Sequence, residues 1–215
     1  MNKKIVPGFA LAAAAVALPA VSHAEVSANI GWVSDYLFRG VFQEDSSASA
    51  GIDFESNGFY IGTWGADVGD GLETDLYFGY GGGEDFTWSV GYTGYFYTDD
   101  FDDTYQEINL GIGYGIFSLD VAVGEWDGFG TPQDYTFGSI TIAPEKWPYF
   151  KFGSWGDDFD GDYFELGYSF DFMGLDLSIA LTYSDDLQVS DPDDGESAEY
   201  GIAFGITKSL ALGSR

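Results

Sequence analysis

Apolar and polar residues alternate with a period of two along most of the chain after Glu25. The clearest example places Leu175, Leu177, Ile179 and Leu181 on one face, with small or polar residues between them. Such alternation is typical of β-strands that carry one apolar face. No stretch of comparable length repeats apolar residues at the spacing of an α-helix. The pattern therefore predicts an all-β protein.

Twelve segments carry this alternation and are predicted to be strands. They begin near residues 26, 47, 58, 74, 86, 104, 116, 134, 147, 163, 174 and 198. Short connections alternate with longer ones along the chain, as in barrels of the bacterial outer membrane. Strands of about ten residues match a tilted crossing of a bilayer. We therefore expect a single transmembrane, antiparallel, up-and-down β-barrel of about twelve strands, with about ten to fourteen compatible with the pattern.

The first 24 residues have the parts of a secretory signal peptide. Lys3 and Lys4 form a basic start, residues 5–18 form an uncharged apolar run, and small residues at 22 and 24 precede a cleavage site. The run is shorter than the roughly 20 residues of a bilayer-spanning helix. We expect cleavage after Ala24, which leaves residues 25–215 as an exported barrel in the cell outer membrane. A retained N-terminal anchor is the alternative.

Charge and composition exclude several classes of protein. The chain has 36 acidic and 7 basic residues, and its formal net charge is −29. A nucleic-acid partner is not expected, because phosphate binding needs a basic surface. The chain has no cysteine, and its one histidine, His23, lies in the predicted signal peptide. The mature chain thus lacks the usual nucleophile–histidine pairs and metal ligand sets, so we expect no enzyme, cofactor or metal centre. Carboxylate-pair chemistry, as in glycosidases, is the exception that composition leaves open.

The position of the charged residues indicates a polar interior. Most acids fall in the predicted connections, and those within strands lie opposite the large apolar residues. Arg39 and Lys151 are the basic residues expected on the same polar face. The predicted pore-lining set is Asp35, Arg39, Asp53, Asp75, Glu107, Asp120, Lys151, Glu165, Asp176 and Glu199.

Two roles are open for Arg39. If the first strand runs unbroken to Gly40, Asp35 and Arg39 share its polar face about 13 Å apart and do not pair directly. Arg39 is then either a filter residue that faces acids across the lumen or a structural ion-pair partner in a crowded interior. The structural role is favoured, because isolated carboxylates in a tight interior need a cation.

Two acidic segments invite comparison with calcium-binding loops. Residues 158–162 and Asp191 to Asp194 are dense in carboxylates. An EF-hand loop that starts at Asp158 would need Glu at its twelfth position, where the chain has Ser169. Solvated surface loops are therefore favoured, and weak binding of divalent cations is the alternative.

The many aromatic residues are interpreted as belts at the membrane interface rather than as a sugar-binding site.

Several motifs resemble one known family. The segment Ser34-Asp35-Tyr36-Leu37-Phe38-Arg39-Gly40, followed by Gln43, is similar to the opening motif of the TorF family of proteobacterial porins. Residues 58–64 (GFYIGTW) and 75–80 (DLYFGY) follow in the order and spacing of that family. The resemblance covers about residues 26–80 and implies an outer-membrane barrel with solute passage. One departure is the end of the chain, residues 210–215 (LALGSR), where such barrels usually close with an aromatic residue.

The expected function is the passive passage of small cationic or neutral solutes by a protein in contact with outer-membrane lipid. An excess of carboxylates in a confined passage attracts cations, so replacing Glu107 and Glu165 by Gln is expected to weaken the preference for cations. Two alternatives stay open. One is an exported soluble β-sandwich, either a carbohydrate-binding module or a carboxylate-dependent glycosidase. The other is a closed barrel with a structural or adhesive role.

The alternating connections also predict an orientation. With the N-terminus in the periplasm, the longer connections lie on the cell surface, and the first of these is Gly40 to Ser46. An epitope inserted between Asp191 and Asp194 is then accessible on intact cells, whereas one at Asn57 is not.

Overall fold

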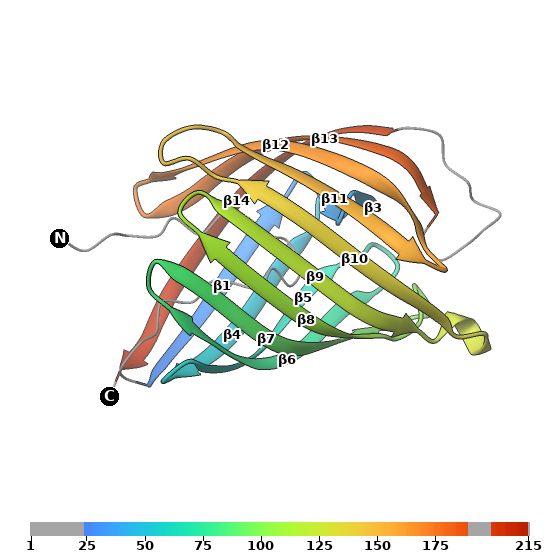
Figure 1. Ribbon diagram of the computed structural model, residues 1–215, viewed down its shortest axis with the longest axis horizontal. Coiled ribbons are helices and arrows are strands. Elements are labelled where there is room, and N and C mark those ends of the chain that lie inside the picture. Colours follow the sequence, from blue (N-terminus) through green and yellow to red (C-terminus); the bar gives the residue numbers. More distant parts are fainter. Residues whose placement is uncertain (1–23, 189–198, 215) are drawn as a thin grey trace.

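A computed structural model describes residues 24–188 and 199–214, and it shows one sheet that closes on itself. Twelve antiparallel strands follow one another around the ring, and the first pairs with the last (Figure 1). The predicted fold class is confirmed, and the predicted strand starts agree with the observed ones to within three residues. The alternative of a soluble β-sandwich is wrong, because there is a single closed sheet rather than two packed ones.

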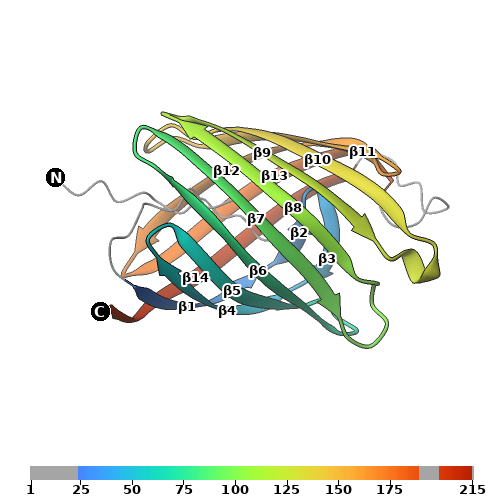
Figure 2. The same ribbon diagram turned by 60° about the horizontal axis from the view of Figure 1, so that its bottom comes forward.

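The barrel strands are long enough to cross a bilayer at a tilt, which the ribbon shows in both views (Figures 1 and 2). Their bounds are β1 Glu25–Val33, β4 Ala48–Ser56, β5 Phe59–Asp67, β6 Leu72–Gly83, β7 Phe86–Tyr97, β8 Tyr105–Tyr114, β9 Phe117–Trp126, β10 Gln133–Ile142, β11 Tyr149–Asp157, β12 Asp160–Phe172, β13 Leu175–Gln188 and β14 Glu199–Ser214.

Tight turns gather at one end of the barrel, which we call the short-turn end. Asn57 and Gly58 have φ angles of 51° and 87°, and Met173 and Gly174 have 57° and 75°. Positive φ at both central residues is the signature of the two-residue turn that suits the twist of a hairpin. The other connections lie at the opposite, long-loop end, where the short 3-10 helix η1 (Gly128–Gly130) projects beyond the strands (Figure 1).

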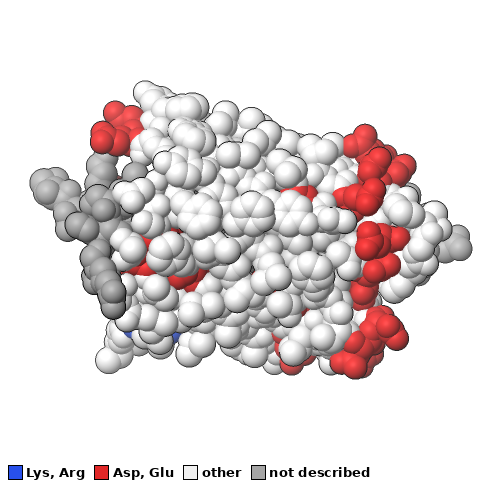
Figure 3. Space-filling view, turned by 90° about the horizontal axis from the view of Figure 1, so that it is seen from below, with Lys and Arg blue, Asp and Glu red and all other residues white. Residues whose placement is uncertain are grey.

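The outer surface of the barrel is apolar. Large side chains such as Ile108, Leu110 and Phe78 point outward and are about half exposed. The residues between them point inward and are buried or half-buried. Figure 3 shows a mostly uncharged wall, with most of the visible acidic atoms at the long-loop end. An apolar band of this kind would be costly in water and is what a lipid environment requires. No helix within the described residues is both long and apolar enough to span a membrane.

The chain between β1 and β4 forms a separate hairpin that enters the barrel. Strands β2 (Asp35–Phe38) and β3 (Val41–Asp45) pair with each other and belong to no other sheet. The turn residues Arg39 and Gly40 have φ angles of 49° and 88°, the same two-residue turn seen at the short-turn end. The expectation of a first strand that runs unbroken to Gly40 is therefore wrong, because β1 ends at Val33 and the chain reverses at Arg39.

The tip of this hairpin lies against the opposite wall of the lumen. A Cβ atom added to Gly40 would approach the Cβ atom of Tyr163 on β12 to 2.7 Å and Ser184 Oγ on β13 to 3.1 Å. The expectation that Gly40 to Ser46 emerges on the cell surface is thus wrong for the hairpin tip. The physical reason is that Arg39 and its apolar neighbours find a carboxylate and aromatic rings inside the barrel, whereas a surface loop would leave those rings in water.

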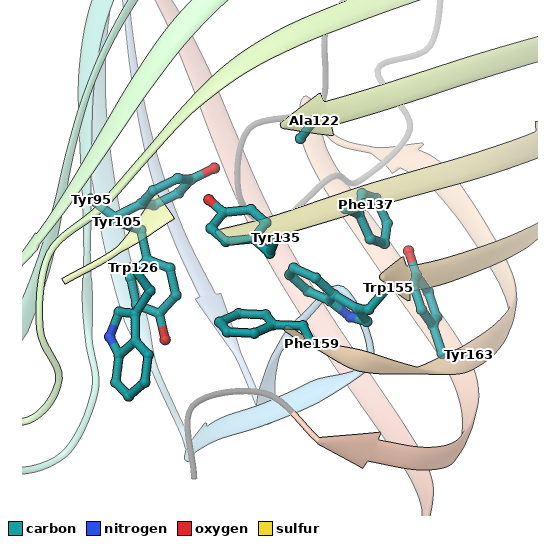
Figure 4. Packing of buried hydrophobic residues seen from close by; sticks show 9 residues of the cluster. All are labelled: Tyr95, Tyr105, Ala122, Trp126, Tyr135, Phe137, Trp155, Phe159 and Tyr163. Atoms are coloured by element: carbon teal, nitrogen blue, oxygen red, sulfur yellow. The ribbon is translucent and has the colours of Figure 1, made fainter. Parts of the chain in front are cut away.

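Aromatic side chains fill the lumen on the long-loop side. The cluster, shown in Figure 4, consists of Tyr95, Tyr105, Ala122, Trp126, Tyr135, Phe137, Trp155, Phe159 and Tyr163. Phe38 of β2 packs against it. Tyr135 and Phe159 stack with their ring centroids 5.1 Å apart, and Trp155 lies beside both. The interpretation of the aromatics as membrane belts is therefore incomplete, because these rings form a core inside the barrel.

Inward glycines make room for inward tyrosines. A Cβ atom added to Gly124 on β9 would lie 2.6 Å from the ring of Tyr135 on the neighbouring strand. A Cβ atom on Gly62 would meet the ring of Tyr77 at the same distance. The two rings therefore occupy the space that a side chain at Gly62 or Gly124 would need, so a larger residue at either position would displace the ring.

Candidate channel interior

The hairpin and the barrel wall are joined by a buried ion pair. Arg39 Nη1 and Nη2 donate to Glu107 Oε2 and Oε1 at 2.8 Å and 2.6 Å, so the ion pair is bidentate. Their side chains are 8% and 0% exposed. Among the described residues this is the one ion pair, and it links the hairpin to β8, nearly opposite β1 around the ring.

Three further side chains of the wall hold the Glu107 carboxylate. Tyr95 on β7 donates to Oε1 at 2.8 Å, Tyr135 on β10 donates to Oε2 at 2.9 Å, and Asn109 Nδ2 donates to Oε1 at 2.6 Å. Asn109 in turn accepts a hydrogen bond from Thr93 at 2.9 Å. A carboxylate with this many donors is well satisfied even in a dry interior.

Aromatic faces surround the Arg39 guanidinium. Its central carbon lies 4.4 Å from the ring centroid of Phe137, 4.8 Å from that of Phe38 and 5.4 Å from that of Trp155. All three distances are within the range of a cation–π interaction. The guanidinium is thus held by one carboxylate and three rings.

The rest of the hairpin is fixed by individual hydrogen bonds. Tyr36, which is fully buried, donates to Glu73 Oε1 on β6 at 2.7 Å. Trp155 Nε1 donates to the Arg39 carbonyl at 3.2 Å, and Ser184 donates to the Gly40 carbonyl at 2.7 Å. The hairpin therefore touches wall strands on several sides of the lumen.

A second acidic residue lies near this ion pair. Asp75 follows Glu73 on the inward face of β6 and is 2% exposed. Its Oδ1 atom is buried and has no hydrogen-bond partner in the structure. Arg39 attracts Asp75, whereas Glu73 and Glu107 repel it. The middle of the lumen thus holds more acidic groups than the single arginine can balance.

Toward the short-turn end the inward acids are only partly buried. Asp53 accepts a hydrogen bond from Tyr77, and Glu165 accepts one from Tyr149 at 2.6 Å. Lys151 lies directly across from Glu165 in the pairing of β11 and β12. The charged side chains in this part of the lumen are therefore half-buried rather than fully enclosed.

The structure distributes nine of the ten predicted pore residues over three places. Arg39, Asp75 and Glu107 come together in the middle of the lumen, and Asp53, Asp120, Lys151, Glu165 and Asp176 lie on its wall toward the short-turn end. Asp35 lies at the base of the hairpin, where Ser34 Oγ donates to it at 2.5 Å. The Glu199 side chain lies outside the described residues. That these residues line an open passage stays a prediction.

The acidic loops show no metal centre within the described ranges, where no group of three or more Asp, Glu or His side chains is placed to hold an ion. Asp191 to Asp194 lies outside those ranges. In the connection after β7, Asp102 accepts hydrogen bonds from Tyr105 at 2.9 Å and Trp126 at 3.0 Å. Burial raises the pKa of Asp102, and these hydrogen bonds oppose that shift.

Sequence reasoning missed the residues that complete the site. Tyr95, Tyr135, Phe137 and Trp155 hold Arg39 and Glu107 in place, yet none was singled out. A signal existed on β7, where the inward face changes from Ser89, Gly91 and Thr93 to Tyr95. That change from small to aromatic residues on one face marks the level at which the lumen is filled.

Comparison with solved structures finds porins. Pseudomonas aeruginosa OccK2 (OpdF) matches with 13% identity and a TM-score of 0.38, over 79% of this chain and 59% of that one. Pseudomonas aeruginosa OccK1 (OpdK) matches with 11% identity and a TM-score of 0.41, over 79% of this chain and 57% of that one. A mutant porin of Rh. blastica matches with 10% identity and a TM-score of 0.40, over 87% of this chain and 99% of that one. The chain thus spans less than two thirds of the two Pseudomonas porins.

Comparison with curated proteins finds no match. A family model matches residues 17–185 and is described as a bacterial protein of unknown function (Gcw_chp). This match covers residues 17–24, the hairpin, the barrel strands from β1 to β12 and most of β13. It does not confirm the TorF label, and it assigns no activity. Because the model covers well over half of the chain, the protein belongs to the Gcw_chp family.

Proposed function

We propose that the protein is an outer-membrane channel for small cationic solutes and that the β2–β3 hairpin closes it. The observation that carries this proposal is an apolar closed barrel whose inward face bears Asp53, Asp75, Asp120 and Glu165 besides the paired Glu107. In a confined, poorly screened passage such an excess of negative charge attracts cations and repels anions. We also propose that residues 1–24 are the export signal and that the long-loop end faces the cell surface.

The filled middle of the lumen favours one competing function. The aromatic cluster and the Arg39–Glu107 pair are buried together inside the barrel, as a purely structural barrel would require. A channel differs from a structural barrel in that the hairpin must be able to leave. The sheet of β2 and β3 is separate from the barrel sheet, so it can move without breaking a barrel strand pair.

Cation preference is expected to depend on the acids near the short-turn end. Replacing Asp53 and Asp120 by Asn and Glu165 by Gln removes three negative charges from the wall and is expected to move the reversal potential in a salt gradient toward zero. Glu107 is paired with Arg39 while the hairpin is docked, so its charge is added to that of the wall acids only when the hairpin has withdrawn. The triple variant leaves Glu107 unchanged and therefore tests the three acids near the short-turn end alone. The measurement is the reversal potential of single channels reconstituted in a planar bilayer.

The matched control is Glu145→Gln, which removes a charge from the exposed connection between β10 and β11. It is expected to leave the reversal potential nearly unchanged. If the triple variant were as cation-selective as the wild type, these three acids would not determine the selectivity.

A further inference from the structure

The groups that hold the Arg39 guanidinium belong almost entirely to the barrel wall. Glu107 comes from β8, Tyr95 from β7, Tyr135 and Phe137 from β10, and Trp155 from β11. We call these five residues the wall site. Phe38 is the one ring around the guanidinium that moves with the hairpin. If the hairpin withdraws, the Glu107 carboxylate and the rings of Phe137 and Trp155 stay on the wall.

The wall site is also organised without Arg39. Tyr95, Tyr135 and Asn109 orient the Glu107 carboxylate through hydrogen bonds of 2.8 Å, 2.9 Å and 2.6 Å. Phe137 and Trp155 pack against each other with ring centroids 5.0 Å apart, so their faces are fixed by the wall. A prearranged site loses little conformational entropy when a ligand enters.

The chemistry of this site selects a planar organic cation. A carboxylate with both oxygens available accepts the parallel N–H groups of a guanidinium, and aromatic faces bind the delocalised charge from the sides. A hydrated metal ion could use the carboxylate but would not gain from stacking. We propose that the wall site binds guanidinium-bearing solutes and that Arg39 is its tethered occupant. This inference rests on the proposed channel, because the solute reaches the site through the lumen.

A consequence is competition between the solute and the hairpin. A guanidinium compound that occupies the wall site excludes Arg39 and removes the ion pair that docks the hairpin. The ligand therefore shifts the population toward the undocked hairpin by its preference for that state. A guanidinium solute would thus favour the opening of the channel through which it passes.

Arg39→Ala tests the inference, because it empties the wall site and leaves Glu107 in place. Methylguanidinium chloride, titrated into the folded variant in detergent and followed by tryptophan fluorescence, is expected to bind saturably. Arg39→Ala/Glu107→Gln is expected to bind at least about tenfold more weakly, since it loses charge-assisted hydrogen bonds. The wild type is also expected to bind methylguanidinium at least about tenfold more weakly than Arg39→Ala, because the tethered Arg39 side chain competes for the site. Sodium chloride at equal ionic strength gives the background.

The outcomes separate this inference from the channel itself, because binding in detergent requires no current. If the protein binds methylguanidinium saturably but never conducts, the proposed channel function is wrong and the proposed wall site still stands. Equal binding by the single and double variants, or none by a folded Arg39→Ala, would overturn the site whatever the conductance. Folding is judged by heat-dependent migration on a detergent gel. If Arg39→Ala does not fold alone, Arg39→Gln replaces it, and refolding that methylguanidinium but not sodium restores would support the site.

Discussion

Replacing Glu107 by Ala is expected to release the hairpin from the lumen. The change leaves the Arg39 guanidinium buried without its carboxylate, and the loss of one partner from a buried ion pair typically costs about 3–5 kcal/mol. The barrel need not lose all of this free energy, because the hairpin can swing out and return Arg39 to water. The expected result is therefore an undocked hairpin in an intact barrel, which trypsin detects by cleaving between Arg39 and Gly40.

Two variants bracket this prediction. Glu125→Ala removes an exposed acid from the same end of the barrel and is expected to leave Arg39 protected. Arg39→Ala/Glu107→Ala removes both charges, so it is expected to cost less stability than Glu107→Ala alone. Protection of Arg39 in Glu107→Ala equal to that in the wild type would show that the ion pair does not hold the hairpin.

The barrel was predictable from the sequence because its signal is local and repeated. Each strand carries its own alternation, and residues such as Ile179 and Ile108 face outward wherever the strand lies in the ring. Turn residues such as Asn57-Gly58 mark the reversals independently. Many consistent local signals specify the register and the order of the strands together.

The hairpin was not predictable in the same way. Tyr36 and Phe38 fall between Asp35 and Arg39, so this segment reads as a continuation of β1, and Arg39-Gly40 is a weaker turn signal than Asn-Gly. What decides its position is a set of contacts between residues far apart in the chain, such as Tyr36 with Glu73 and Arg39 with Glu107. Alternation shows that Glu107 faces inward, but not which cation meets it.

The aromatic core inside the barrel escaped prediction for a related reason. An aromatic residue at the end of a strand fits a membrane belt and a filled lumen equally well, and only the face on which it lies separates the two. Tyr105, Trp126 and Tyr135 lie on inward faces, together with the polar residues. The expectation that the inward face carries mainly small and polar residues concealed that difference.

Deleting the hairpin is expected to open the barrel. A link of two residues can replace residues 35–45, because Ser46 N already donates to the Ser34 carbonyl at 2.7 Å and Val33 N to the Ser47 carbonyl at 2.9 Å. If the undocked state is a minor population of about 0.1–10% in the wild type, deletion raises the mean current about tenfold to a thousandfold. The matched control shortens the connection around η1, which lies outside the lumen, and is expected to leave the current unchanged.

The most direct test of the account records wild-type and hairpin-deleted protein in planar bilayers across a salt gradient. We expect rare openings of the wild type, a steady current through the hairpin-deleted barrel, and a reversal potential that favours cations for both. A silent hairpin-deleted barrel that still migrates as a folded protein would contradict the channel and leave a structural barrel. Equal currents from the two proteins would contradict closure by the hairpin, and anion selectivity would contradict the acidic lumen.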